Sequence, residues 1–362
     1  MNNQPHFQIE KIISASKPGS GHAPFEIRFI WVGLFFTVFG GLSVGTIAAI
    51  SSAFHLPMLS YYVTMYQSHG FLQLVAWTGG FILPISLHFI PRFAGVPLKY
   101  KKAPSVVFTF FAVSLLFRYV GKLFVPLAST MSEWISLISG VFFFAGISYY
   151  IYSILRIMLE AKKKIKRPAF PPVAPFFLMV LAGWGGYAAL DVFLSVHMLI
   201  TDSVVAETIW SRFAVEYFIG FVLFPISFSF AIRTFPLYLR LPAADWPVRK
   251  LAIFYAFSTM IYLLPLVPFL QKLNYSVSAA TSAVGILLRC CAVIWLIWKL
   301  DILTRVQITW LQKYEMETPK ERKPTRAGLP DYGEFGRFEL PVYAAFSWLF
   351  LGVVLQGVNE SV

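Results

Sequence analysis

The sequence predicts an all-α integral membrane protein, a polytopic bundle of about nine transmembrane helices whose N-terminus is cytoplasmic. Three observations lead to this fold class. First, 57% of the 362 residues are hydrophobic and only 13% are charged, about half the charged share of a typical soluble domain. Second, the apolar residues form blocks of about 20, the length of a helix that crosses the hydrocarbon core of a bilayer. Third, the basic residues gather in alternate connections between these blocks, as the positive-inside rule requires.

Nine apolar blocks define the expected spans, and helices are required there because backbone groups have no water to bond in lipid. The spans are expected at 27–51, 68–91, 104–126, 134–158, 172–200, 210–236, 251–271, 277–299 and 339–357. The chain then divides into an N-terminal tail (1–26), an eight-helix bundle (27–300), a long loop (301–338) and a ninth helix with the C-terminus (339–362). The tail is polar through Ala23 and shows no cleavable signal-peptide pattern.

The distribution of Lys and Arg sets the expected orientation. The connections at 92–102, 159–167 and 237–250 are basic, as is the 301–338 loop, whereas 52–68 and 127–133 contain no Lys or Arg. The positive-inside rule makes the basic side cytoplasmic, which places the tail and the 301–338 loop inside and the C-terminus outside. The expected location is the bacterial inner (cytoplasmic) membrane.

The net charge of +13 would also suit a nucleic-acid-binding protein, but the basic residues lie in loops between apolar blocks. We therefore expect contact with anionic membrane lipid and no nucleic acid partner. The two cysteines, Cys290 and Cys291, are adjacent in an apolar block and point to different sides of a helix, so neither a metal pair nor a structural disulfide is expected. The sequence has no nucleotide-binding glycine loop, nucleophile elbow or zinc-type spacing.

A weak internal repeat relates the second and sixth spans. Leu83-Pro-Ile-Ser86 is followed by Arg92, and Phe224-Pro-Ile-Ser227 is followed by Arg233 at the same offset. Both spans are expected to run from outside to inside, and parallel repeats occur in membrane proteins. The alternative is a chance match between two aromatic-rich apolar segments, and the sequence leaves both interpretations open.

Polar residues inside the expected spans are the candidate functional residues, because placing them in a bilayer is costly. His69 and Gln73 begin the second span, four residues apart and therefore on one face. The other candidates are Arg118 and Lys122 in the third span, Asp191 and His197 in the fifth, Glu216 in the sixth and Arg289 in the middle of the eighth. On the expected topology, most of them fall in the outer half of the bilayer.

Several of these residues also have an interpretation that involves no ligand. Arg118 and Asp191 can form an ion pair inside the membrane. Lys122, Glu216 and His197 can extend their polar ends to the membrane interface. These alternatives stay open because the order of the helices in the bundle is unknown at this stage.

The functional interpretation is that the polar residues surround a haem. A haem needs an axial imidazole, which His69 can supply, and its propionates need Arg or Lys, which Arg118 and Arg289 can supply. The alternative for His69 is a solvated histidine at a span end. Arg289 is far from both interfaces, so it needs a carboxylate or an anionic ligand group as its partner. The aromatic content of 18% suits packing against a flat macrocycle, but it suits lipid equally.

Two segments of the second span are the strongest family signal in the chain. They are Ser68-His-Gly-Phe-Leu-Gln-Leu-Val-Ala-Trp-Thr-Gly-Gly80 and Leu87-His-Phe-Ile-Pro-Arg-Phe-Ala-Gly-Val-Pro-Leu98. Three shorter segments follow the same order: Ala23-Pro-Phe25, Leu115-Leu-Phe-Arg118 and Ala231-Ile-Arg-Thr-Phe-Pro236. Together they resemble the NnrS family, which is distantly similar to subunit I of haem-copper oxidases.

The resemblance implies a haem- and copper-containing membrane protein tied to nitric oxide metabolism, nitrosative stress or respiratory electron transfer. His69 matches a family histidine and also the low-spin haem ligand on the second helix of oxidase subunit I. The sequence departs from the family in three ways. Family members often have two histidines around the start of the second-span motif, whereas here only His69 stands, with Gln67 and Phe71 nearby. Spans six to eight contain no histidine, so an oxidase-like binuclear centre is not expected. The family also continues past the Tyr343 to Val354 helix, so this chain is expected to be short at its C-terminus or to be completed by partner subunits.

We therefore expect a membrane protein that binds haem, of b-type, with copper as an additional metal that the resemblance allows. His69 is the expected axial and metal ligand, Gln73 lies beside it, and Arg118 and Arg289 pair with the propionates. Whether the protein is an enzyme is left open. The alternatives from other classes are a secondary transporter, which the intramembrane charges and the repeat would also suit, and a non-catalytic membrane scaffold.

Overall fold

The computed structural model describes residues 25–56, 62–164, 173–238, 244, 246–267, 270, 275–303 and 339–359. Within this part of the chain the regular structure is helical, and no strand occurs. Eight helices are long and apolar enough to cross a membrane: Arg28–Ala53, Tyr62–Ala94, Ala103–Leu123, Ser129–Lys163, Ala174–Ile200, Thr208–Phe235, Val248–Leu266 and Val277–Leu300. Each overlaps one of the first eight expected spans, which confirms the all-α polytopic membrane fold.

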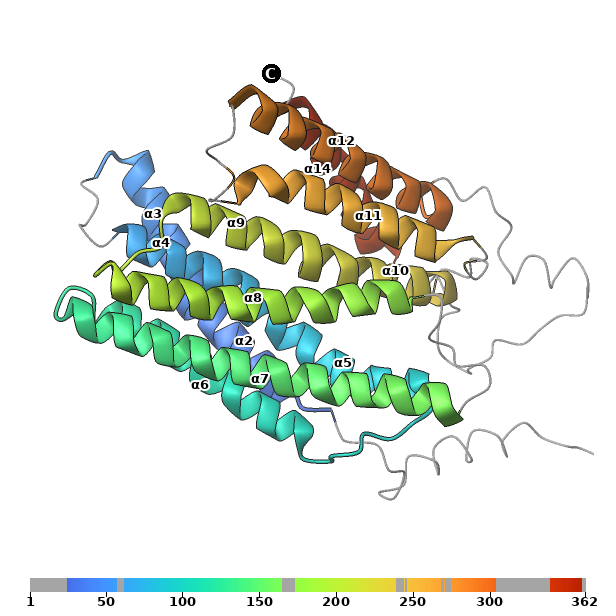
Figure 1. Ribbon diagram of the computed structural model, residues 1–362, viewed down its shortest axis with the longest axis horizontal. Coiled ribbons are helices and arrows are strands. Elements are labelled where there is room, and N and C mark those ends of the chain that lie inside the picture. Colours follow the sequence, from blue (N-terminus) through green and yellow to red (C-terminus); the bar gives the residue numbers. More distant parts are fainter. Residues whose placement is uncertain are drawn as a thin grey trace, which may run out of the picture.

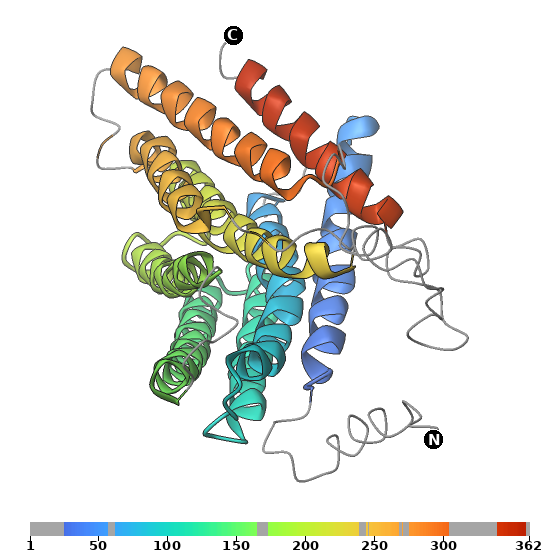
Figure 2. The same ribbon diagram turned by 90° about the vertical axis from the view of Figure 1, so that its right-hand side faces the viewer.

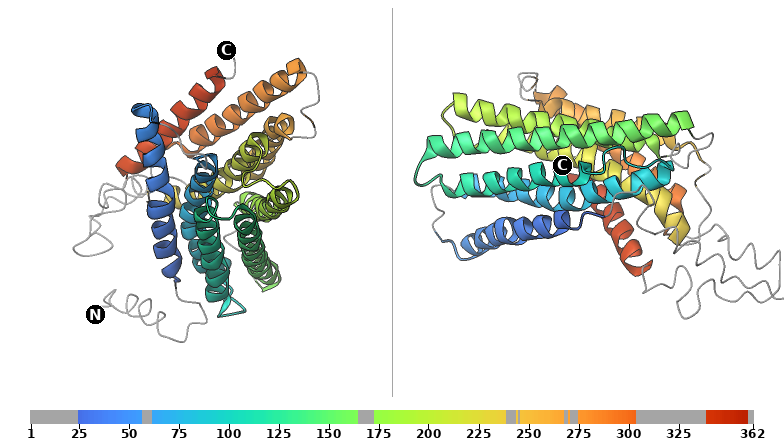
Figure 3. Two further views of the ribbon diagram at one scale, coloured as in Figure 1. Left: turned by 90° about the vertical axis from the view of Figure 1, so that its left-hand side faces the viewer. Right: turned by 90° about the horizontal axis from the view of Figure 1, so that it is seen from below.

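The ninth expected span is helix α14 (Glu339–Asn359), whose apolar stretch Leu340–Gln356 is shorter than the other eight. It packs against α12 (Tyr275–Leu300). Figures 2 and 3 show these two helices together at one side of the bundle, away from the segments at residues 103–164. The expected tail and the 301–338 loop lie almost wholly outside the described residues, and the sidedness of the bundle stays a prediction.

Three of the spans contain a π-helical segment. The first consists of α2 (Arg28–Phe35), η1 (Phe36–Leu42) and α3 (Ser43–Ala53), and the second of α4 (Tyr62–Phe71), η2 (Leu72–Gly79) and α5 (Gly80–Ala94). The sixth consists of α9 (Thr208–Phe218), η3 (Ile219–Leu223) and α10 (Phe224–Tyr238). The other spans are α6 (Ala103–Leu123), α7 (Ser129–Lys164), α8 (Ala174–Ile200), α11 (Val248–Leu263) with the short 3₁₀ turn η4 (Leu264–Leu266), and α12.

The second and sixth spans carry a proline at the offset of the internal repeat. Pro84 and Pro225 are 141 positions apart (225 against 84), whereas the helices that contain them end at Ala94 and Tyr238, 144 positions apart (238 against 94), so the helix ends do not follow this offset. In both spans a π-helical segment lies just before the proline. Proline has no N–H and crowds the preceding turn, so it disturbs the helix in the same way in each span. The packing partners repeat as well, because α6 packs on α7 as α11 does on α12, and α2 on α5 as α8 does on α10.

Interlocking aromatic rings fill the core between α7, α8 and α9. Trp184 meets Phe143 and Phe218 edge to face, at centroid distances of 6.1 and 5.2 Å. Tyr187, one helical turn further along α8, meets Phe218 at 4.9 Å. Such edge-to-face pairs add to the energy of close packing. The cluster holds three helices together directly beside the polar residues described below.

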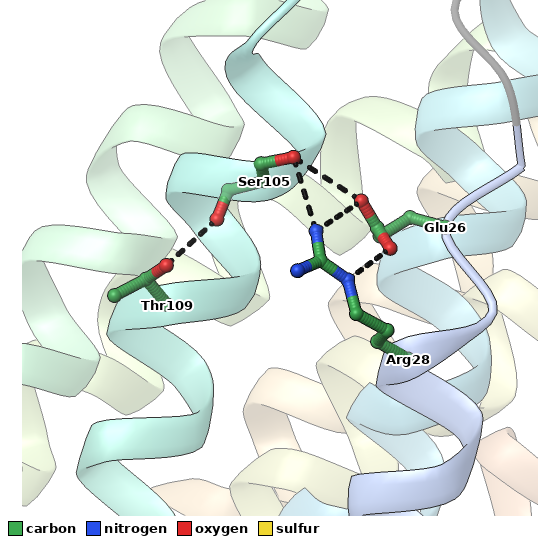
Figure 4. A network of polar contacts seen from close by, with 4 residues as sticks. All are labelled: Glu26, Arg28, Ser105 and Thr109. Atoms are coloured by element: carbon green, nitrogen blue, oxygen red, sulfur yellow. Dashed lines mark hydrogen bonds and ion pairs between the residues drawn. The ribbon is translucent and has the colours of Figure 1, made fainter.

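An ion pair at the start of α2 is hydrogen-bonded to Ser105 at the start of α6 (Figure 4). The guanidinium of Arg28 donates from Nε to Glu26 Oε1 at 2.6 Å and from Nη2 to Glu26 Oε2 at 2.8 Å. The same Nη2 donates to Ser105 Oγ at 3.2 Å, and the Ser105 hydroxyl donates to Glu26 at 3.2 Å. The hydrogen bonds from Arg28, together with its positive charge, hold the pKa of Glu26 below its ordinary value, against an opposing effect of partial burial.

Replacing Glu26 by glutamine should lower the melting temperature slightly at neutral pH, because the side chain keeps its shape but loses its charge. The pKa of Glu26 is depressed in the folded protein, so its contribution is present above the ordinary value of 4.5 and is lost as the pH falls through the folded pKa. Thermal unfolding in detergent at neutral pH and across the acid range measures this. A difference between Glu26→Gln and the parent that persists in acid would contradict the assignment.

Candidate functional site

His69 lies in the last turn of α4 and contacts the first span. Its Nδ1 is 2.6 Å from the carbonyl oxygen of Gly41 in η1. A carbonyl only accepts hydrogen bonds, so in the neutral ring Nδ1 carries the proton and donates, and Nε2 keeps its lone pair. Among the described residues this is the one hydrogen bond that the ring makes. An imidazole held in this way can bind a metal through Nε2.

Two glycines of the first span make room for His69 and Gln73. A Cβ atom on Gly45 would lie 2.9 Å from His69 Cε1, and one on Gly41 would lie 2.6 Å from Gln73 Nε2. The Gln73 amide in turn is 3.5 Å from the carbonyl oxygen of Thr37. His69 and Gln73 therefore share one face, as their spacing predicts, and this face packs against η1 and α3. Both polar contacts use carbonyls of a π-helical segment, a local geometry that is frequent at functional sites.

Arg118 on α6 and Asp191 on α8 form a buried ion pair. Their side chains are 7% and 9% exposed, and Arg118 Nη2 donates to Asp191 Oδ2 at 2.5 Å. Arg118 Nε donates to Ser139 Oγ on α7 at 3.2 Å, and the guanidinium lies 4.3 Å from the centre of the Phe71 ring. The ion pair that the sequence left open as an alternative is therefore present. It joins three helices, and each charge compensates the other where water is scarce.

These polar residues meet at a cavity of about 330 Å³. Its wall includes His69, Gln73, Arg118 and Asp191, four of the predicted site residues, together with Lys122. The remainder of the wall comes from the second, fifth and sixth spans and from the connection before α9. The volume is at the lower end of the range for small-molecule sites, and the few converging polar groups are typical of such sites.

The connection between α8 and α9 is held to the cavity wall by two side chains. Lys122 Nζ donates to the carbonyl oxygen of Val204 at 2.9 Å. Gln67 pairs with both backbone groups of Ala206: its Nε2 donates to the carbonyl at 2.6 Å and its Oε1 accepts from the N–H at 2.9 Å. Gln67 and Ala206 both belong to the cavity wall.

Arg289 and Glu216 belong to a second polar cluster, which does not border the cavity. Arg289 Nη1 is 3.8 Å from Glu216 Oε2, and Nη2 donates to Gln356 Oε1 of α14 at 2.9 Å. The guanidinium lies 4.3 Å from the centre of the Tyr262 ring. The carboxylate that Arg289 was expected to need is therefore Glu216. Since Gln356 is on α14, this cluster ties the ninth helix to the bundle.

His197 lies apart from both clusters. It sits near the end of α8, where its half-buried ring is 6.2 Å from the ring of Phe193, and it is not part of the cavity wall. The structure thus brings five of the eight candidate residues to the cavity, Lys122 included, and separates three from them, namely His197, Glu216 and Arg289.

Sequence reasoning did not identify Gly41, Gly45, Gln67 or Gln356 as contributors. Gly41 and Gly45 are four residues apart, a spacing of small residues that often marks close helix packing in membranes. Gln67 and Gln356 are amides within apolar helices, so the rule that flagged the charged residues could have included them. Their partners are backbone groups or residues of distant helices, which no sequence pattern reveals.

Comparison with protein-family models, with curated proteins and with solved structures finds no match for this chain. The site is therefore interpreted from its own geometry and from the sequence resemblance of the second span.

Replacing Asp191 by leucine should destabilise the protein strongly, by about 3–5 kcal/mol, because it leaves Arg118 buried without its counter-charge. The double variant Arg118→Met with Asp191→Leu should be more stable than Asp191→Leu alone, because no unpaired guanidinium remains. Denaturation in detergent measures both changes. A double variant whose loss of stability equals the sum of the two single losses would show that the pair is not coupled.

Proposed function

We propose that this chain binds a haem at the cavity through Nε2 of His69, as a membrane protein of the NnrS and haem-copper oxidase subunit I type. The contact of 2.6 Å between His69 Nδ1 and the Gly41 carbonyl carries the proposal. A metal-binding histidine almost always donates its other ring N–H to a carbonyl or carboxylate, which orients the ring and raises the basicity of the ligand nitrogen. A haem at this position would supply one-electron chemistry.

Two cations at the cavity suit the propionates of a haem. Arg118 borders the cavity, but its guanidinium is already paired with Asp191. Lys122 also borders it, and its ammonium carries three N–H donors and makes one hydrogen bond in the described part of the chain, to Val204. We therefore assign the propionate contact to Lys122 first and to Arg118 second. Arg289, expected in this role from the sequence, is assigned to the docking of α14 instead.

The positions of the two cysteines argue against a covalently attached haem. Cys290 and Cys291 are the two cysteines of the chain, and neither is part of the cavity wall. Covalent attachment of a c-type haem uses a C-x-x-C-H motif, so the proposal specifies a non-covalent, b-type haem. Copper is left out of the proposal, because no group of three or more His, Cys, Asp or Glu side chains among the described residues could hold a metal ion. A role in electron transfer or the nitric oxide response, and a place in the bacterial inner membrane, rest on the resemblance alone.

A secondary transporter is the second candidate, favoured by the intramembrane charges and by the weak repeat between the second and sixth spans. Parallel repeats are known in transporters, whose substrate sites lie between the repeated halves. The cavity lies between spans two and three of the first half and spans five and six of the second. In this case Asp191→Ala would abolish substrate uptake, and the purified protein would carry no pigment.

The difference spectrum of the purified protein in detergent, dithionite-reduced minus oxidised, tests the proposal. We expect a Soret and an α-band in the parent, and loss of both in His69→Ala because the iron loses its axial ligand. His197→Ala is the matched control, since it removes a half-buried histidine of α8 that does not touch the cavity. Lys122→Met should lower the haem content without removing the bands.

The controls separate the candidates. A pigment that survives in His69→Ala but disappears in His197→Ala would move the ligand to α8 and contradict the assignment. If the parent protein lacks haem even after expression with added haem, haem binding is contradicted and the transporter is favoured.

A further inference from the structure

The connection at 203–207, here called the strap, is a short segment between two helix ends. At its start, α8 finishes with Asp202 in the left-handed conformation (φ 49°), and the N–H of Ser203 donates to the carbonyl of Met198 at 2.9 Å. This pattern closes a helix and fixes where the chain leaves it. At its end, the N–H of Ser211 donates to the carbonyl of Glu207 at 3.0 Å and begins α9. The strap is therefore anchored at both ends, and Figure 1 shows it at one end of the bundle.

Side chains, rather than secondary structure, satisfy the backbone of the strap. Val204 is bonded by Lys122, and both backbone groups of Ala206 are bonded by Gln67. The Ser203 hydroxyl donates to the carbonyl of Val205 at 2.9 Å. None of the strap residues is fully buried. The strap is thus held down by the three bonds from Gln67 and Lys122, and each such bond is individually weak in water.

The same two side chains line the cavity. Gln67, Lys122 and Ala206 all belong to its wall, and Ala206 is the contribution of the strap to that wall. The side chains that fasten the strap to the second and third spans are therefore also part of the cavity wall.

We propose that the strap is a latch, which Gln67 and Lys122 hold shut and which controls access to the cavity. The inference concerns the same cavity as the proposed function, but it requires no haem. It gives Lys122 and Gln67 a role in the empty protein. A ligand that binds the ammonium of Lys122 would replace its hydrogen bond to the Val204 carbonyl, one of the two side-chain attachments of the strap.

The accessibility of a cysteine placed in the cavity wall tests the latch. Ser68 is 4% exposed and lines the cavity, so Ser68→Cys is a conservative reporter. Cys290→Ser and Cys291→Ser remove the native thiols. The haem-free protein in detergent is labelled with a membrane-impermeant maleimide, and the rate is followed by mass spectrometry. Gln67→Leu and Lys122→Met should each label about 2- to 10-fold faster than the parent, the range expected for loss of one or two weak hydrogen bonds.

Thr201→Ala is the matched control. Its hydroxyl donates to the carbonyls of His197 and Met198 within the end of α8, and not to the strap or to the second or third span. Its labelling rate should therefore equal that of the parent. A milder variant, Gln67→Glu, keeps the acceptor for the Ala206 N–H and loses the donor, so it should label at an intermediate rate.

The outcomes are distinct. If the latch variants label at the parent rate while their melting curves show a folded protein, the latch is overturned. Should Gln67→Leu fail to fold, Gln67→Glu decides the question in the same way. If the protein binds no haem but the latch variants label faster, the proposed function is contradicted and the latch is supported. If the protein binds haem but the latch variants label at the parent rate, the latch is contradicted and the proposed function is supported.

Discussion

The ion pair between Arg118 and Asp191 is the constraint on which the packing of α6, α7 and α8 around the cavity depends. A single charge among apolar helices has no water to solvate it, so it must find a counter-charge and further hydrogen-bond partners. Arg118 finds Asp191 on α8, Ser139 on α7 and the face of Phe71 on α4. One side chain of α6 thus meets three other helices. Because the pair also borders the cavity, the interaction that organises these helices shapes the wall of the site as well.

The first span contributes backbone rather than side chains to the site. Gly41 and Gly45 have no Cβ, so His69 and Gln73 can lie directly against the helix. The Gly41 carbonyl is then close enough to accept a hydrogen bond from His69 Nδ1–H, which fixes the orientation of the ring and of Nε2. Orientation by a backbone carbonyl needs no charged partner. It therefore orients the His69 ring without the cost of another buried charge.

The two polar clusters have different structural roles. The cavity cluster joins the second, third, fifth and sixth spans and borders the space between them. The cluster at Arg289 lies outside the cavity, and its guanidinium is covered by Tyr262 and bonded to Gln356. Its buried Nη1 atom makes no hydrogen bond among the described residues and lies 3.8 Å from Glu216. An arginine that joins two helices away from the cavity serves packing, whereas a buried lysine beside the cavity can meet a ligand there. This difference underlies the assignment of the propionate contact to Lys122 rather than to Arg289.

By itself the sequence determined the membrane fold, eight long spans to within several residues, and the set of polar side chains that needed an explanation. These follow from local composition, because a run of apolar residues of sufficient length is stable in lipid only as a helix. The pairing of His69 with Gln73 on one face also followed, from helical periodicity. Only the tertiary structure decided which of the polar residues meet. Arg118 and Arg289 look alike in the sequence, yet one faces the cavity and the other faces α14. The reason is physical: hydropathy places a residue at a depth in the membrane, but its neighbours at that depth depend on how the helices pack side by side, and that packing is decided by contacts between residues far apart in the chain.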